Sequence, residues 1–353
     1  MAGQPVVVAP ALRSVPTLFG APVAEPAADL EEADVAFLGI PWQAPVPDSR
    51  IGVAGASFFG TNLTPQTFRT NSVKYGGYLP ERDVDVFAAL RFVDCGNVSV
   101  DQDLGTTFGN VASVVEGVVR SGTIALTCGG NSGPSTYGVL RGIAAAADGP
   151  VAVFNFDGHG DNVAGEIEED DPKQPSWGAT WARRIHDLPR VDPARYLHFG
   201  LRGPRNDAGT FERFREKGVD RNHIFTYEHI VGARRSGFEE WAKRAVATAL
   251  DGADGAWIVV DPDVLDMSVC PEFGDEPLGM YPEELCWAAY QVGKAAGRGR
   301  LKGISFTAIP FSAMTLHWIM MYVLMYALAG VVQSDSGKQR VTLSNGEGVG
   351  TDS

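Results

Sequence analysis

The stretch Val151–Asn162, VAVFNFDGHGDN, joins an apolar run to a group of polar residues. The first six residues predict a buried β-strand. Asp157, His159 and Asp161 follow at every second position, and in an extended segment this spacing points three side chains to one side. Two carboxylates and an imidazole would suit a divalent metal. Asp-Gly and Gly-Asp pairs also form turns, so this stretch alone leaves a plain loop equally open.

A second apolar run ends in carboxylates. Residues Ala256–Asp266, AWIVVDPDVLD, lead directly into Asp261, Asp263 and Asp266. Carboxylates beside a buried strand are costly and repel one another unless a cation neutralises them. Pro262 lacks a backbone donor, which suits the end of a strand, and Asp266 suits a turn. The two stretches together predict a metal site of five residues: Asp157, His159, Asp161, Asp261 and Asp263.

Six further apolar runs end in turn residues: DVAFLGIP, FAALRFVDCG, TIALTCGG, YLHFGLRG, HIFTYE and LKGISFTAIP. Helix-like segments at 109–120, 135–147 and 238–250 lie between the runs. This alternation predicts an α/β protein with a mostly parallel sheet covered by helices on both faces. In such sheets, binding and catalytic groups gather at the carboxyl ends of the strands.

The chain has 353 residues, of which 44% are hydrophobic, enough to bury a large core. We expect an extended N-terminal arm at 1–33, a single domain at 34–332 and a flexible tail at 333–353. Ala313–Val332 carries no formal charge over 20 residues, the length of a membrane span. Because no second such segment occurs, a buried or subunit-contact helix is the favoured interpretation.

The net charge of −14 argues against a nucleic-acid or anionic-membrane surface, which would need clustered Lys and Arg. The four cysteines, Cys95, Cys128, Cys270 and Cys286, form no CxxC pair. A zinc site or a disulfide framework is therefore not expected. The N-terminus does not resemble a signal peptide, and we expect a reducing, cytoplasmic setting.

The segments FNFDGHGDN and VVDPDVLD resemble the DxHxD and DxDxxD signatures of the ureohydrolase family, which includes arginases, agmatinases and guanidinases. The segments GIPWQAPVPDSRIGVAGASFFGTNLTPQTFR, HFGLRG and DEPLGMYPEEL agree in order, so the resemblance spans about 34–332. It implies a three-layer α/β/α sandwich with about eight parallel strands. It also implies hydrolysis of a guanidinium group to urea and an amine by two manganese or nickel ions that activate a water.

The resemblance implies a complete ligand set for the deeper metal, formed by Asp157, His159, Asp261 and Asp263. The outer metal would share Asp157 and Asp261, add Asp161, and take an imidazole from a Gly-Gly-Asp-His-Ser corner. This chain reads GGNSG there, with Asn131 in place of the Asp and Ser132 in place of the His. A serine hydroxyl is a poorer ligand than imidazole, so we expect one ion or none.

Two further departures accompany Ser132. Trp177, in SWGATW, stands where the family has a proton-carrying His, and Trp cannot accept a proton. Thr307, in FTAIP, stands where the family has a Glu that grips the guanidinium. Three functional positions are thus altered beside an intact strand framework.

Three interpretations follow. The favoured one is a degenerate, non-catalytic partner of an active paralogue in a trimeric or hexameric hetero-oligomer. The nickel-dependent metformin hydrolases are assemblies of this kind. They combine a catalytic subunit with a degenerate one, and their substrate is a biguanide. The second is an active agmatinase-like hydrolase with an altered substrate. The third, a one-metal amide hydrolase similar to histone deacetylases, is disfavoured because no two of the six histidines are adjacent.

Overall fold

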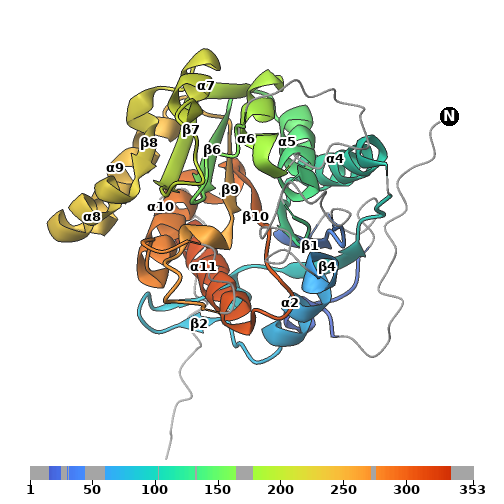
Figure 1. Ribbon diagram of the computed structural model, residues 1–353. Coiled ribbons are helices and arrows are strands. Elements are labelled where there is room, and N and C mark those ends of the chain that lie inside the picture. The colour runs from blue at the N-terminus through green and yellow to red at the C-terminus, as the bar shows by residue number, and fades with distance from the viewer. Residues whose placement is uncertain are drawn as a thin grey trace, which may run out of the picture.

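The computed structural model describes residues 16–24, 30, 32–43, 60–101, 103–131, 133–163, 178–271 and 276–334. Eight strands form one parallel sheet in the order β4-β1-β5-β10-β9-β6-β7-β8 (Figure 1). The strands are β1 Val35–Gly39, β4 Phe92–Asn97, β5 Ile124–Cys128, β6 Val151–Phe156, β7 Val191–Leu201, β8 Ile224–Thr226, β9 Gly255–Val260 and β10 Leu301–Phe306. They correspond to the eight apolar runs, so the predicted sheet is confirmed.

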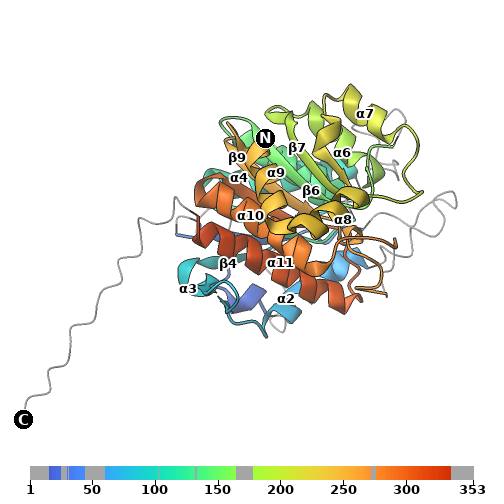
Figure 2. The same cartoon turned by 90° about the vertical axis from the view of Figure 1, so that its left-hand side faces the viewer.

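Helices cover both faces of the sheet (Figures 1 and 2). One face packs against α9 Phe238–Leu250, α10 Pro282–Arg300 and α11 Met314–Val332, and the other against α4 Leu104–Arg120 and α5 Val139–Ala146. Along β9, Ile258 and Val260 enter the first core while Trp257 and Val259 enter the second, all fully buried. The strands read as continuous apolar runs because both faces are covered. The three-layer α/β/α sandwich is confirmed.

The remaining described elements are short. They are the helices α2 Thr64–Ser72, α3 Val86–Ala89, α6 Trp181–Arg184, α7 Thr210–Glu216 and α8 Tyr227–Ser236, an antiparallel pair β2 Tyr78–Leu79 and β3 Val84–Asp85, and the 3-10 turns η1 Leu18–Gly20, η3 Thr61–Leu63, η5 Gly178–Thr180, η6 Ile185–Asp187 and η7 Arg221–His223.

Two of the predicted helices differ from expectation at their N-terminal ends, whereas α9 covers the predicted range 238–250. Helix α4 begins five residues before the predicted segment because the side chain of Asp103 caps it, accepting a hydrogen bond from the Thr106 N–H at 2.7 Å. The segment predicted at 135–147 opens as a π-helix, η4 (Pro134–Gly138), before α5 begins.

A buried ion pair anchors the edge of the sheet. Asp94 of β4 and Arg69 of α2 are at most 1% exposed and are joined by two hydrogen bonds of 2.7 and 2.8 Å. Asp94 also accepts a hydrogen bond from the N–H of Leu18, so residues 16–24 of the predicted arm lie against β4. Residues 1–15 of that arm, and 335–353 of the predicted tail, lie outside the described residues.

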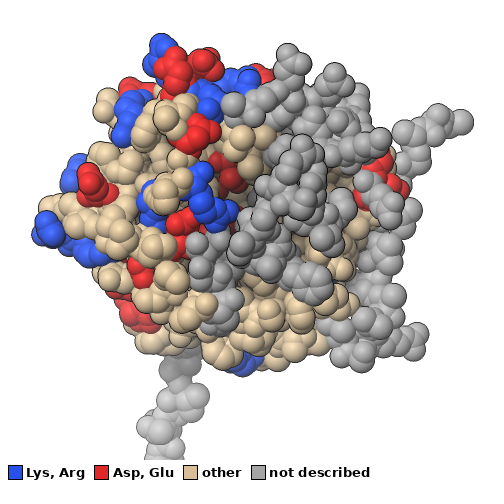
Figure 3. Space-filling model, in the orientation of Figure 1, with Lys and Arg blue, Asp and Glu red and all other residues tan. Residues whose placement is uncertain are grey.

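Helix α11 is the one described helix that is long and apolar enough to cross a membrane, but 72% of its most apolar window is buried within the protein. It packs along α10, as expected for a core helix. The four cysteines are buried thiols. On the described part of the face in Figure 3, basic and acidic side chains interleave rather than gather by sign.

Helices α10 and α11 approach each other through glycines. A Cβ at Gly293 would lie 1.9 Å from the carbonyl oxygen of Ala327, and one at Gly330 would lie 2.2 Å from that of Tyr290. Both neighbours are backbone atoms, which cannot rotate away. The closeness of the two helices therefore depends on the absence of side chains at these two positions.

We expect Gly293→Ala to lower the free energy of unfolding by about 1–3 kcal/mol or more, because α10 and α11 must separate to accept the methyl group. Urea denaturation measures the change. Gly117→Ala is the control, since a Cβ there meets nothing within 4 Å and Ala is the better helix former. Equal unfolding midpoints for the two variants would contradict this account of the helix contact.

Candidate metal centre

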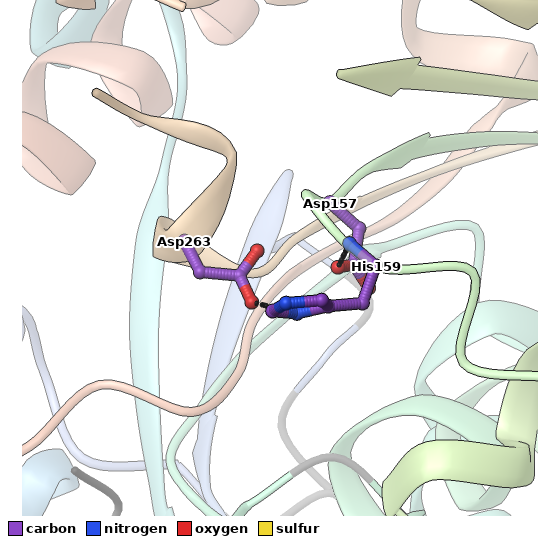
Figure 4. Close-up of side chains that lie close together, drawn as sticks. All are labelled: Asp157, His159 and Asp263. Atoms are coloured by element: carbon purple, nitrogen blue, oxygen red, sulfur yellow. Dashed lines mark hydrogen bonds and ion pairs between the residues drawn. The ribbon is translucent and has the colours of Figure 1, made fainter. Parts of the chain in front are cut away.

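The candidate metal centre lies at the carboxyl ends of two neighbouring strands. Strands β6 and β9 are paired in parallel up to their last residues, so the loops that follow leave the sheet side by side. Asp157 follows β6, and the 3-10 helix η8 (Pro262–Val264) follows β9. Figure 4 shows His159 of the first loop pointing toward Asp263 of the second. The fold therefore joins two motifs about a hundred residues apart.

Backbone N–H groups fix the carboxylates of these loops. The N–H of Gly158 donates to Asp263 Oδ1 and the N–H of His159 donates to Asp157 Oδ1, both at 2.7 Å. Asp261 caps η8 by accepting a hydrogen bond from the N–H of Asp263 at 3.0 Å. The carboxylates are thus held in place by the loops themselves.

Asp157, His159 and Asp263 each offer a ligand atom within 4.8 Å of the others. His159 Nδ1 lies 2.6 Å from Asp263 Oδ2. Asp157 Oδ2 is buried and has no hydrogen-bond partner among the described residues. An unpaired buried carboxylate oxygen is costly, and a divalent cation held by the three side chains would satisfy it. These residues therefore fit one metal ion.

Charges at the centre shift the pKa values of its groups. Burial raises the pKa of Asp157 well above its ordinary value, and the carboxylates of Asp161, Asp263 and Asp261 add to the rise. Burial disfavours a charged His159, but the Asp263 carboxylate outweighs burial and raises the pKa of His159 to about 10. Burial also disfavours ionised Asp263, yet His159 holds its pKa below the usual range. The imidazolium of His159 is then a counter-charge to the Asp263 carboxylate, a role that a metal ion would take over.

A further carboxylate faces the other side of the His159 ring. Glu276 Oε1 lies 3.3 Å from His159 Nε2 and 3.7 Å from Arg205 Nε, and the Glu276 side chain is only 7% exposed. Metal-binding histidines commonly donate their second ring N–H to a carboxylate, which fixes the orientation of the ring. The sequence gives Glu276 no predicted role, because this contact joins residues 117 positions apart.

Arg202, at the end of β7, ties the loops around the centre together. Its Nη2 donates to the backbone oxygens of Asp263, Leu265 and Glu276 at 2.6, 3.0 and 3.2 Å. Its Nε donates to the Pro277 oxygen at 3.0 Å. Arg202 therefore links the Glu276 segment to η8.

A buried neutral histidine forms a hydrogen bond to the loop that follows β6. His198 is fully buried, and burial lowers its pKa to about 4. Its Nε2 donates to the Asp157 carbonyl oxygen at 3.0 Å, while its Nδ1 lies 3.0 Å from the Tyr196 hydroxyl and 3.1 Å from Asn155 Nδ2. Nothing in the spacing of the sequence indicated this contact.

The other two predicted ligands do not join the gathered group among the described residues. Asp261 is 5% exposed and caps η8. Asp161 has a φ of 41°, in the left-handed region, so the extended spacing assumed from the sequence ends before it. Its Oδ2 accepts a hydrogen bond from Trp181 Nε1 at 2.7 Å. Their roles as metal ligands remain predictions.

Of the three positions predicted to differ from the family pattern, one lies within the described residues. Thr307 directly follows β10 and is 1% exposed. Its Oγ1 lies 2.7 Å from the Oγ of Ser135 in η4, so two neutral hydroxyls are paired there. Ser132 and Trp177 lie outside the described residues.

The family model described as "Arginase family" matches residues 33–301 of the chain. The chain is 26% identical to the formimidoylglutamase of Bacillus subtilis over 306 residues, which cover 84% of this chain and 86% of that protein. It is 28% identical to the formimidoylglutamase of Corynebacterium efficiens and 26% identical to the guanidinobutyrase of Pseudomonas aeruginosa. Those matches cover 54% and 59% of this chain and span only 55% and 61% of the relatives' lengths.

Solved structures share the fold. The crystal structure of the B. subtilis formimidoylglutamase has a TM-score of 0.72 at 22% identity and covers 93% of this chain and 95% of that one. The Trypanosoma cruzi formiminoglutamase, crystallised with Mn²⁺, has a TM-score of 0.72 at 19% identity and covers 91% and 99%. At 19–22% identity these similarities show a shared fold and do not by themselves indicate a shared activity.

We expect Glu276→Ala to weaken Mn²⁺ binding by roughly 10–100-fold, because His159 loses the acceptor that orients its ring. Calorimetric titration of the full chain with Mn²⁺ measures the affinity. Glu276→Gln keeps an acceptor oxygen and should lose less, and Glu212→Gln on the exposed surface of α7 is the control for a lost charge. If Glu276→Ala bound Mn²⁺ as tightly as the unaltered chain, the assigned contact would have no role in metal binding.

Proposed function

Because the chain belongs to the arginase family, we propose that it is a subunit of a metal-dependent amidinohydrolase that cleaves a guanidine or biguanide compound, such as metformin, to urea and an amine. In this proposal the chain is the degenerate, non-catalytic partner of an active paralogue in a trimeric or hexameric hetero-oligomer. One observation carries the proposal: Thr307 and Ser135 form a buried pair of neutral hydroxyls. A buried guanidinium needs a carboxylate partner, and this pair cannot supply one.

The predicted ligands of the deeper metal would still bind an ion in this chain. Asp157, His159 and Asp263 would bind a divalent ion, manganese or nickel, with Asp261 completing the predicted set. When bound, such an ion activates a water and polarises the carbon that is attacked. Glu276 would orient the imidazole of His159. Arg202 would keep the loop of Asp263 in register with that of Glu276.

Exposed aromatic residues support a subunit contact. Trp318 and Tyr322 of α11 are 40% and 50% exposed, and Val73, just after α2, is 55% exposed. Aromatic side chains are enriched at protein interfaces. Helix α2 contacts α11, so an active paralogue could cover residues of both helices at once.

A second candidate function is an active hydrolase with an altered substrate. The names of the relatives favour it, since two are formimidoylglutamases and one is a guanidinobutyrase. The side chains of Asp157, His159 and Asp263 lie together, and the neutral pair of Thr307 and Ser135 would suit a substrate that needs no carboxylate partner. A one-metal amide hydrolase stays the third candidate, supported by the same three side chains alone.

We expect the isolated chain to release no urea from metformin, guanidinobutyrate or agmatine, and no glutamate from formimidoylglutamate. Urea release should appear when the chain is co-expressed with an arginase-family paralogue encoded beside it, and the two proteins should co-purify. Colorimetric urea determination and size-exclusion chromatography with light scattering measure both results. The physical reason is the missing carboxylate at Thr307, which leaves a guanidinium without a partner.

Ser132→His provides the matched control. It adds the missing imidazole but leaves Thr307 unchanged, so the isolated variant should also release no urea. The paralogue expressed alone shows how much activity depends on this chain. Turnover of any of the four compounds by the isolated, unaltered chain at about 1 s⁻¹ or faster, an ordinary enzymatic rate, would reject the partner role and favour the second candidate.

A further inference from the structure

Asp161 is held by a buried tryptophan. Its Oδ2 accepts a hydrogen bond from Trp181 Nε1 at 2.7 Å, and Trp181 is 1% exposed. The indole N–H can only donate, and a buried one needs an acceptor. The half-buried carboxylate of Asp161 supplies that acceptor. The contact therefore satisfies the buried indole N–H.

The position of Trp181 is fixed by the sheet. Its ring packs edge-on against Trp257 of β9, with ring centres 6.0 Å apart at 80°. The Nε1 of Trp257 donates to Ser305 Oγ at 2.8 Å, and Ser305 also accepts a hydrogen bond from Thr127 of β5 at 2.8 Å. A chain of contacts thus runs from three strands to the indole that holds Asp161.

The backbone of Asp161 is tied to the same region. Its carbonyl oxygen accepts a hydrogen bond from the N–H of Ala182 at 3.1 Å, and the N–H of Val163 donates to the Ala179 oxygen at 2.9 Å. The left-handed φ of 41° turns the chain at Asp161 away from the extended course expected after β6. Both the backbone and the side chain of Asp161 therefore accept hydrogen bonds from helix α6.

We propose that Trp181 keeps Asp161 out of metal coordination, so that this centre takes one divalent cation, held by Asp157, His159 and Asp263. The proposal rests on the proposed function for the existence of that metal site. Asp161 does not belong to the described group of ligand atoms within 4.8 Å of one another. A cation that recruited Asp161 through Oδ2 would have to compete with the indole N–H for that oxygen, which raises the cost of a second ion. Trp181 is thus a positioning residue that sets metal stoichiometry.

Mn²⁺ binding by the full chain tests the proposal. Calorimetric titration, with electron paramagnetic resonance of free Mn²⁺ as a second readout, should give one ion for the unaltered chain. Trp181→Phe keeps an aromatic ring but removes the N–H, and it should bind a second Mn²⁺ roughly 10–100-fold more tightly than the unaltered chain does. Adding Asp161→Asn to Trp181→Phe should abolish that gain. Circular dichroism and urea unfolding report whether each variant folds.

Asp161→Asn alone tests the same idea without disturbing the tryptophan. Asparagine keeps an acceptor for the indole and has the same shape, so the first Mn²⁺ should bind within about twofold of its original affinity, well below the tenfold loss typical of a disrupted metal site. A tenfold loss in this variant would show that Asp161 is a ligand. Weaker binding of the first ion by Trp181→Phe would show that the indole supports coordination. Either result overturns the proposal.

The outcomes separate this inference from the proposed function. If the unaltered chain bound no ion, or two ions tightly, the proposal of a centre that binds one ion would be wrong. If the unaltered chain bound one ion and the folded Trp181→Phe variant also bound only one, the single-ion centre would be supported. The role of Trp181 in excluding Asp161 would then be rejected.

Discussion

Carboxylates withdrawn from water at the ends of β6 and β9 set the requirement that the rest of the centre meets. Asp157 and Asp263 are 1% and 3% exposed, and like charges so placed need a cation between them. His159 lies against Asp263, and Glu276 lies against the far side of the same ring. The whole arrangement depends on the parallel pairing of the two strands, which delivers the loops to one place.

Polar groups at the strand ends are satisfied in two different ways. After β6 and β9, backbone N–H groups and Arg202 hold the loops while Asp157 Oδ2 stays without a protein partner among the described residues. After β10, the Thr307 hydroxyl is paired with that of Ser135. A polar group with a protein partner gains less from a ligand than one without. The ends of β6 and β9, where Asp157 lies, are therefore better prepared for a cation than the end of β10.

The sequence was sufficient for the sheet because each strand is a continuous apolar run buried on both faces, with its polar residues directly after it. It placed Asp157, His159 and Asp263 for the same reason. It could not place Asp161, whose left-handed φ breaks the period of two. It gave no role to Glu276 or His198, since their contacts depend on loop positions that only packing determines. Nothing in the composition of the segment before α5 indicated its π-helical start.

The strand order also bears on how the chain folds during synthesis. Strand β10 lies between β5 and β9, although it is the last strand to be made. Until residues 301–306 have left the ribosome, no strand pairing within the described residues joins β1, β4 and β5 to the sheet half that carries Asp157 and Asp263. During synthesis the two half-sheets therefore expose unpaired strand edges, which can pair with other chains and aggregate. Slow folding is expected for a parallel fold rich in long-range contacts. A truncation before β10 would leave those two half-sheets unjoined.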